Sequence, residues 1–216
     1  MLIKVAEDKG QQKKKHEVKH KWFTDNGIEL VPLPLPVGDY ILLDDRVQAV
    51  IDRRGSKLKK MDLLGVTKIS VDTKKDLGEV TNNICGKSHA RFRDECILAQ
   101  QNGIKLIVLV EHSRYIRSLD DVEHWKNPRQ YQYEQKIRRL WGIPKGADFS
   151  AEVAELKAHG AKINRGPTTG PELAASMRTM SEKYGVVWKF CDKKETGRII
   201  LEILQEGTAH VSEKTA

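Results

Sequence analysis

Asp39, Asp72 and Lys74 are the residues whose types and spacing most directly suggest chemistry. Asp39 lies in the segment 37–42, and the other two lie in the segment 69–74. If both segments are neighbouring strands, Asp72 and Lys74 share one face about 7 Å apart, because successive side chains of a strand point to opposite faces. Two carboxylates can hold a divalent metal ion, and a lysine beside them can orient water or stabilise charge on a phosphate. This combination suggests hydrolysis of phosphodiester bonds.

Strands that alternate with helices would position these residues. Short apolar runs predict strands at 2–7, 28–31, 37–43, 69–74, 104–111 and 186–191, with 47–51 extending a hairpin. Helical periodicity predicts helices at 13–26, 88–102, 172–184 and 193–205. The near-continuous apolar run at 104–111 is typical of a strand covered on both faces, so we expect it to be the central strand. The alternation predicts an α/β fold with a mixed central sheet flanked by helices.

The chain has 216 residues, which suits one substantial domain, and we place that domain at 1–205. Two stretches interrupt its pattern: a basic insertion at about 44–67 and a larger insertion at about 112–170. In the larger insertion, aromatic residues among lysines and arginines suit either a small local core or a base-stacking platform. We expect the last residues, 206–216, to form a disordered tail.

The composition favours a polyanionic partner. The chain has 38 lysines and arginines against 30 acidic residues, a net charge of +8, and a pI near 9.3. Charge alone fits a merely basic soluble protein equally well. The three cysteines stand far apart without a C-x-x-C pattern, which argues against a disulfide framework or a zinc knuckle and for a reducing, cytoplasmic setting. No apolar run has the length of a signal peptide or a membrane span, so we expect a soluble protein without a membrane partner.

A competing motif lies in the first predicted helix, where His16-Glu17-Val18-Lys19-His20 satisfies H-E-x-x-H. On a helix, both histidines would share a face suited to zinc, with Glu17 as the general base of a metalloprotease. Lysines inside and around the motif instead favour a solvated basic helix. The zinc metalloprotease is therefore a remote alternative.

The order of these segments resembles the XPF-type branch of the PD-(D/E)xK nucleases. The residues that carry the resemblance are Glu7-Asp8, 38–42, 71–74, the helical segment 90–96 and the buried run 106–111. It covers most of 1–111 and, more loosely, 170–205, and the whole chain is similar to phage and prophage proteins with this nuclease domain. Members of the branch are structure-specific DNA endonucleases that use Mg²⁺ or Mn²⁺. The resemblance therefore implies a restriction-endonuclease-like core and DNA as the partner.

The resemblance also implies roles for individual residues. Asp39 and Asp72 would be metal ligands, the backbone carbonyl of Thr73 a further ligand, and Lys74 the motif lysine. Asp8 stands where the family has a first-strand aspartate; whether Asp8, Glu7 or Asp76 completes the metal site stays open. Asp72 replaces a glutamate of the family motif, Thr73 replaces an arginine, and Asp76 stands closer to the lysine than the family aspartate does.

The expected DNA contacts lie on two segments. Arg91 matches a family arginine that approaches the DNA backbone, and the complete set is Lys75, Lys87, Arg91 and Arg93 near the site with Arg53 and Arg54 in the basic insertion. We interpret Glu95 as an i,i+4 partner of Arg91. By analogy with dimeric relatives, a homodimer is a further expectation. A nucleic-acid-binding module without catalysis is the main alternative, and the choice between DNA and RNA stays open.

Overall fold

The computed structural model describes residues 3–10, 17–112 and 115–212. In this part of the chain, six strands form one sheet in the order β2-β1-β3-β4-β5-β6. The strands are β1 (Lys4–Asp8), β2 (Glu29–Leu33), β3 (Tyr40–Leu42), β4 (Ile69–Lys74), β5 (Lys105–Glu111) and β6 (Val187–Cys191). β3 runs antiparallel to both of its neighbours, and the other adjacent pairs are parallel. The predicted mixed sheet is confirmed.

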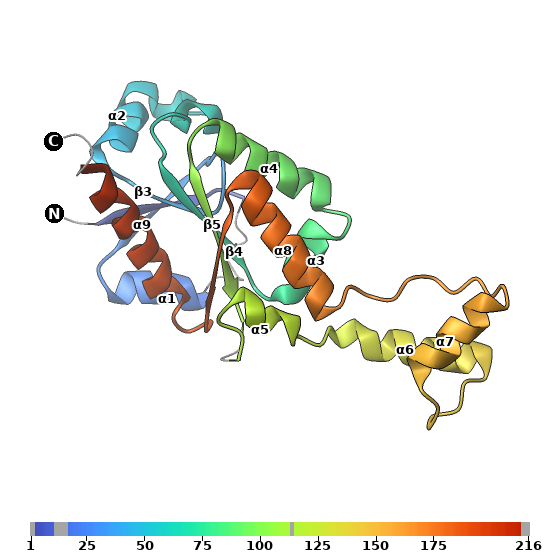
Figure 1. Ribbon diagram of the computed structural model, residues 1–216. Coiled ribbons are helices and arrows are strands. Elements are labelled where there is room, and N and C mark those ends of the chain that lie inside the picture. Colours follow the sequence, from blue (N-terminus) through green and yellow to red (C-terminus); the bar gives the residue numbers. More distant parts are fainter. Residues whose placement is uncertain (1–2, 11–16, 113–114, 213–216) are drawn as a thin grey trace.

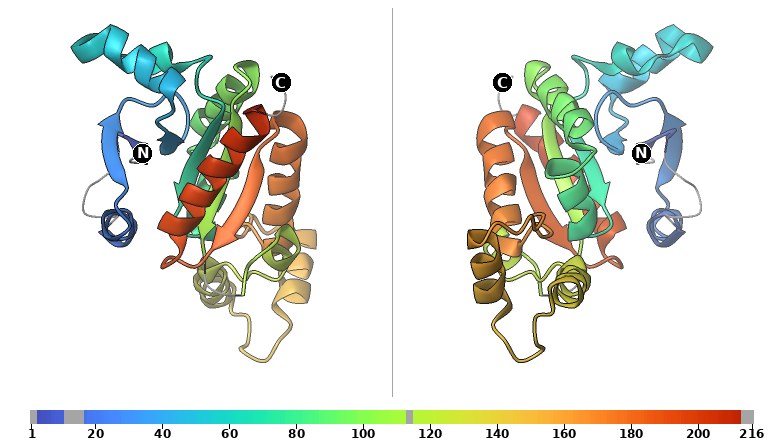
Figure 2. Two further views of the ribbon diagram at one scale, coloured as in Figure 1. Left: turned by 90° about the vertical axis from the view of Figure 1, so that its left-hand side faces the viewer. Right: turned by 90° about the vertical axis from the view of Figure 1, so that its right-hand side faces the viewer.

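Helices cover both faces of the sheet (Figure 2). On one side lie α1 (Glu17–Asp25) and α9 (Thr196–Ser212); on the other lie α3 (Leu77–Ile84), α4 (His89–Gln101) and α8 (Gly170–Tyr184). In β5, Ile107 and Leu109 pack toward α1 and α9, whereas Leu106, Val108 and Val110 pack toward α3, α4 and α8. This double coverage explains the continuous apolar run. The expectation of a central position was wrong, because β5 lies next to the edge strand β6.

Residues 47–51 form a helix and not a strand, which corrects the expected hairpin extension. They belong to α2 (Asp45–Arg54), and the Asp44 side chain caps this helix by accepting a 2.9 Å hydrogen bond from the backbone N–H of Val47. Val47 and Val50, three residues apart, are buried against a separate apolar cluster. Two short 3₁₀ turns follow, η2 (Gly55–Lys57) and η3 (Lys60–Leu63).

The segment between β5 and α8 projects from the body of the protein (Figure 1). It contains α5 (Leu119–Glu123), which packs on α8, then α6 (Pro128–Trp141) and α7 (Phe149–Ala158). We call residues 126–167 the arm. Tyr133 and Phe149 of the arm pack with its buried isoleucines, so part of the aromatic set forms a local core.

The ends of two predicted helices differ from expectation. α9 continues to Ser212, past the predicted domain end at 205, and residues 213–216 lie outside the described part of the chain. The predicted start of the first helix, at residues 13–16, also lies outside it. Among the described residues, no helix is long and apolar enough to cross a membrane.

Candidate active site

Asp39 and Asp72 meet where β3 and β4 adjoin. Tyr40 pairs with Val71 in the antiparallel register, so Asp39, just before Tyr40, lies opposite Asp72, just after Val71. The backbone N–H of Asp39 donates to the Val71 carbonyl at 2.8 Å. Gly38 makes this approach possible: its φ is +68°, and a Cβ there would lie 2.2 Å from Ser70 Oγ. Position 38 therefore requires glycine for steric reasons, while Asp39 supplies the reactive carboxylate.

Asp72 and Lys74 form a buried ion pair on the side of the sheet that faces α4. Lys74 Nζ lies 2.5 Å from Asp72 Oδ2, and the side chains are 8% and 5% exposed. The ammonium group also lies 5.3 Å from the ring centroid of Phe92. The structure thus brings together Asp39, Asp72 and Lys74, the three residues predicted to be catalytic.

Burial dominates the electrostatics of this pair. Burial raises the pKa of Asp72 to about 8; the charge of Lys74 opposes this rise, and that of Asp39 adds to it. Burial on its own would lower the pKa of Lys74, but the negative charges of Asp72 and Asp39 outweigh it and raise that pKa. A second cation at this place would therefore relieve repulsion among the carboxylates.

The Asp39 carboxylate is held by Thr73, the residue between Asp72 and Lys74. Oδ2 of Asp39 accepts hydrogen bonds from the Thr73 backbone N–H at 2.8 Å and from its hydroxyl at 2.6 Å. No hydrogen bond reaches Oδ1 of Asp39 from the described residues. One carboxylate oxygen is thereby fixed while the other keeps its lone pairs for a ligand.

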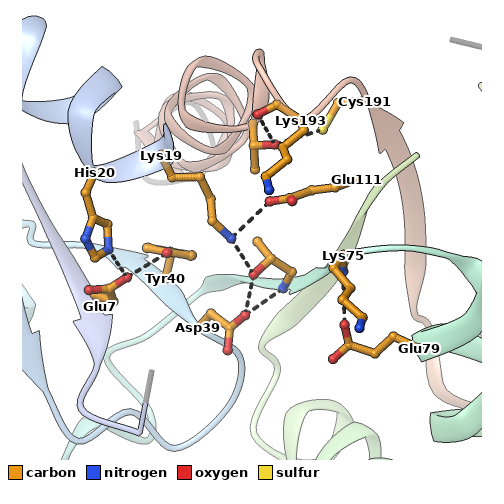
Figure 3. Close-up of polar contacts among 12 residues, drawn as sticks. Glu7, Lys19, His20, Asp39, Tyr40, Lys75, Glu79, Glu111, Cys191 and Lys193 are labelled. Carbon is orange, nitrogen blue, oxygen red and sulfur yellow. Dashed lines mark hydrogen bonds and ion pairs between the residues drawn. The ribbon is translucent and has the colours of Figure 1, made fainter. Parts of the chain in front are cut away.

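A buried chain of polar contacts supports Thr73 from the opposite side of the sheet (Figure 3). Lys19 of α1 is 4% exposed; its Nζ donates to Thr73 Oγ1 at 3.1 Å and lies 3.0 Å from Glu111 Oε1. This position contradicts the expectation of a solvated face for Lys19. The sequence offered no signal for the pairing, because Glu111 stands far along the chain at the end of β5.

The H-E-x-x-H motif lies beside this chain of contacts. Nε2 of His20 lies 2.7 Å from Glu7 Oε1, and the Tyr40 hydroxyl donates to the same oxygen at 2.7 Å. Burial, reinforced by Glu7, raises the pKa of Tyr40. Glu17 is exposed, and His16 lies outside the described residues. Glu7 and His20 thus serve a polar cluster that packs α1 on the sheet.

The other candidate metal ligands are used elsewhere. The backbone N–H of Asp8 donates to the Asp39 carbonyl at 2.8 Å, but its carboxylate accepts from the N–H groups of Leu35 and Gly10, each at 3.0 Å. Asp76 caps α3 through the N–H of Glu79. Across residues 3–10, 17–112 and 115–212, no group of three or more His, Cys, Asp or Glu side chains is placed to hold a metal ion.

Glu95 is the site residue that the sequence interpretation missed. Its Oε1 accepts a 2.8 Å hydrogen bond from the Gly38 N–H, and its charge raises the pKa of Asp72. The expected pairing with Arg91 is not observed in the described structure. A signal was available, since residues 92, 95, 96 and 99 follow the i, i+3, i+4, i+7 spacing of the inner face of α4.

The predicted DNA contacts fall into two groups. Lys75, Lys87 and Arg91 are exposed near the Lys74 end of β4 and the start of α4, and Arg93 pairs with Asp94 at 2.9 Å. Arg53 and Arg54 belong to α2, which leaves from the opposite end of the sheet (Figure 1). Arg54 is also paired with Asp62 at 2.5 Å. These two arginines therefore lie away from Asp39, Asp72 and Lys74, and their contact with DNA stays a prediction.

The fold and this cluster define an α/β protein with an Asp, Asp, Lys site at adjoining strand ends, the arrangement that the motif order predicted. The ERCC4 domain model matches residues 8–203, so the chain belongs to the ERCC4 domain family of XPF-type nucleases. The structure is similar to that of XPF from Aeropyrum pernix, solved in complex with DNA, at 14% identity and a TM-score of 0.48. That match covers 96% of this chain and 66% of the other, slightly under two thirds of its length. No curated protein matches the chain.

Proposed function

We propose that this protein is a divalent-metal-dependent endonuclease that cuts branched DNA at the site of Asp39, Asp72 and Lys74. The observation that carries the proposal is the meeting of these three side chains at adjoining strand ends in a member of the ERCC4 domain family. The net charge of +8 suits a polyanionic substrate. The proposed activity and the proposed DNA substrate rest on three observations together: the site, the family membership and the positive charge.

The donor set fits a hard cation. Asp39 offers a free Oδ1 held in place through Oδ2. Burial is the main cause of the raised pKa of Asp72, and the charge of Asp39, which adds to it, favours a bound cation. All-oxygen ligation suits Mg²⁺ or Mn²⁺ better than Zn²⁺, with the Thr73 carbonyl as a further proposed ligand. Such an ion polarises the scissile phosphate and lowers the pKa of water.

The protein's own groups have separate tasks in this proposal. Thr73 orients Asp39, so the carboxylate is preorganised and does not have to be ordered during the reaction. Lys74 keeps its charge, because its pKa is raised, and that charge stabilises the negative phosphate as bonds change. The low exposure of Asp72 and Lys74 excludes water and strengthens both interactions.

The test is a cleavage assay on labelled duplex, single-stranded, flap, fork and four-way-junction DNAs, with RNA counterparts, in Mg²⁺ or Mn²⁺. We expect wild type to cut branched DNA and the variants Asp72→Asn and Lys74→Met to lose at least about 100-fold in rate. Lys105→Met, at the exposed start of β5, is the matched control and should cut normally. Equal cutting by wild type and Lys74→Met would refute the assigned site.

A binding module without catalysis is the second candidate. It is favoured by the lack of a three-ligand cluster among the described residues and by the direct pairing of Asp72 with Lys74. The two functions separate in one experiment: a wild-type protein that binds branched DNA tightly yet cuts no substrate in either metal is a binding module. Metal-dependent cutting that Asp39→Asn abolishes, with binding preserved, establishes the nuclease.

A further inference from the structure

The arm emerges from the same end of the sheet as the site. β4 ends at Lys74 and the parallel strand β5 ends at Glu111, and the chain continues from there through α5 into the arm. Figures 1 and 2 show α6 and α7 projecting beyond this end of the sheet, while α2 lies at the other end. A long substrate bound at the site can therefore extend along the arm.

The arm has its own internal structure. Ile137, Ile143 and Ile163 are buried in its apolar cluster, and the Tyr133 hydroxyl donates to the Asn164 carbonyl at 2.7 Å. Arg138 donates to Glu134 at 2.9 Å and stacks over Phe149 at 5.3 Å. These contacts hold α6 against α7 without help from the exposed charged side chains of α6.

Most of the protein's net charge lies on the arm. Residues 126–167 contain nine lysines and arginines against four acidic residues, which gives +5 of the total of +8. Arg138 and Arg165 are paired with Glu134 and Glu172. In the described structure the other seven cations have no ion pair. An excess of positive charge on a projecting element attracts a polyanion such as a nucleic acid.

The unpaired cations of α6 are ordered along one side. Arg129, Lys136 and Arg139, with Gln132 between them, are all exposed, and their i, i+3, i+7, i+10 spacing places them on one stripe. At 1.5 Å per residue, the stripe is about 15 Å long. We call these four residues the α6 stripe.

We propose that the α6 stripe binds the phosphate backbone of a duplex branch of the DNA that is cut at Asp39, Asp72 and Lys74; this inference rests on the proposed function. The stripe has only cations and an amide, which suits sequence-independent phosphate contacts. An interfacial membrane helix or a stable protein interface needs apolar side chains, and a single-strand platform needs stacked aromatics. The stripe itself contains none of these, and the exposed Tyr131, Leu140 and Trp141 of α6 lie outside it.

The experiment compares full-length wild type with the triple variant Arg129→Gln, Lys136→Gln, Arg139→Gln. The matched control is Lys145→Gln, Lys157→Gln, Lys162→Gln, which removes the same charge from exposed positions of the arm outside the stripe. Binding to branched DNAs of increasing duplex length is measured over a series of salt concentrations. We expect the stripe variant to lose about 10- to 100-fold in affinity for long branches and to lower the salt slope by roughly 2 to 3.

The control should lose little affinity, keep most of the dependence of binding on salt concentration, and cut branched DNA at the wild-type rate. A stripe variant with the wild-type slope, or one that behaves like the control, overturns the inference. The proposed function fails separately. If wild type cuts nothing but the stripe variant still loses slope, the stripe binds DNA and the nuclease proposal is wrong. Circular dichroism and melting confirm that both variants are folded.

Discussion

The hydroxyl of Thr73 donates to Asp39 across 2.6 Å and accepts from Lys19 at 3.1 Å, so one side chain links the proposed metal site to the buried polar layer behind the sheet. Thr73 stands where the family motif has an arginine. A β-branched residue suits strand β4, and in this buried position its hydroxyl supplies the side-chain hydrogen bond to Asp39.

Replacing Thr73 with valine keeps the shape of the side chain and removes both hydroxyl contacts. We expect Thr73→Val to lower the free energy of unfolding by about 1–3 kcal/mol, because Lys19 loses a buried partner. Asp39 keeps only the backbone donor, so the metal concentration for half-maximal cleavage should rise several-fold. Urea unfolding and metal titration measure the two effects.

Thr73→Ser is the control for this prediction, because serine restores the hydroxyl. Its metal requirement should stay close to that of wild type. If Thr73→Val and Thr73→Ser need the same metal concentration, the hydroxyl does not position Asp39.

The Lys19–Glu111 pair predicts a large asymmetry between single and double variants. Lys19→Met leaves Glu111 charged and buried, which should cost about 3–5 kcal/mol of unfolding free energy. The double variant Lys19→Met, Glu111→Leu removes the unpaired charge and should recover most of that loss. Lys21→Met, two residues along the same helix, breaks only an exposed pair with Asp25 and should cost less than about 1 kcal/mol. If the double variant is as unstable as Lys19→Met alone, the loss is not caused by an unpaired buried charge on Glu111.

The raised pKa of Asp72 predicts how stability changes with pH in the metal-free protein. Its pKa is about 8 in the folded protein, against about 4 when unfolded, so the folded state binds more protons between these values. Stability should therefore fall as pH rises from about 4 to about 8, by at most about 1.4 kcal/mol per pH unit. The raised pKa of Lys74 affects stability only at a pH above this range.

Urea unfolding across this pH range, in the presence of a chelator, measures the effect. Asp72→Asn cannot ionise, and its stability should vary less with pH than that of wild type. Saturating Mg²⁺ should also flatten the wild-type curve, because a bound cation stabilises the carboxylate. Parallel curves for wild type and Asp72→Asn would show that Asp72 does not titrate in this window.

The sequence could predict those parts of the fold that rest on local pattern. β4 was predicted with its observed bounds, Ile69–Lys74, because apolar and reactive residues alternate along it. α2 was missed because its valines favour a strand, while the capping Asp44 that decides for a helix was overlooked. The burial of Lys19 was not predicted, because the sequence does not distinguish this lysine from its solvated neighbours. Only its distant partner Glu111 explains the burial.

Topology alone fixes where the basic insertion lies relative to the site. Asp39 precedes β3 and Asp72 lies near the end of β4, so the chain between these antiparallel strands must turn at the opposite end of the sheet. Arg53 and Arg54 therefore lie away from the site, and this placement follows once both strands are assigned. The arm could not be placed in this way, because its direction depends on the packing of α5 against α8.

Glu95 gives the last prediction, because its two roles can be separated. Glu95→Gln keeps an acceptor for the Gly38 N–H but removes the negative charge that helps raise the pKa of Asp72. We expect unchanged folding and a several-fold higher Mg²⁺ requirement, since a less negative site attracts a divalent cation less strongly. Glu95→Ala removes both roles and should also destabilise the protein by about 1–3 kcal/mol. Asp94→Gln, on the exposed side of the same helix, should change neither quantity. If Glu95→Gln has the wild-type Mg²⁺ requirement, the charge of Glu95 does not help to bind the metal, and its only role is the hydrogen bond to Gly38.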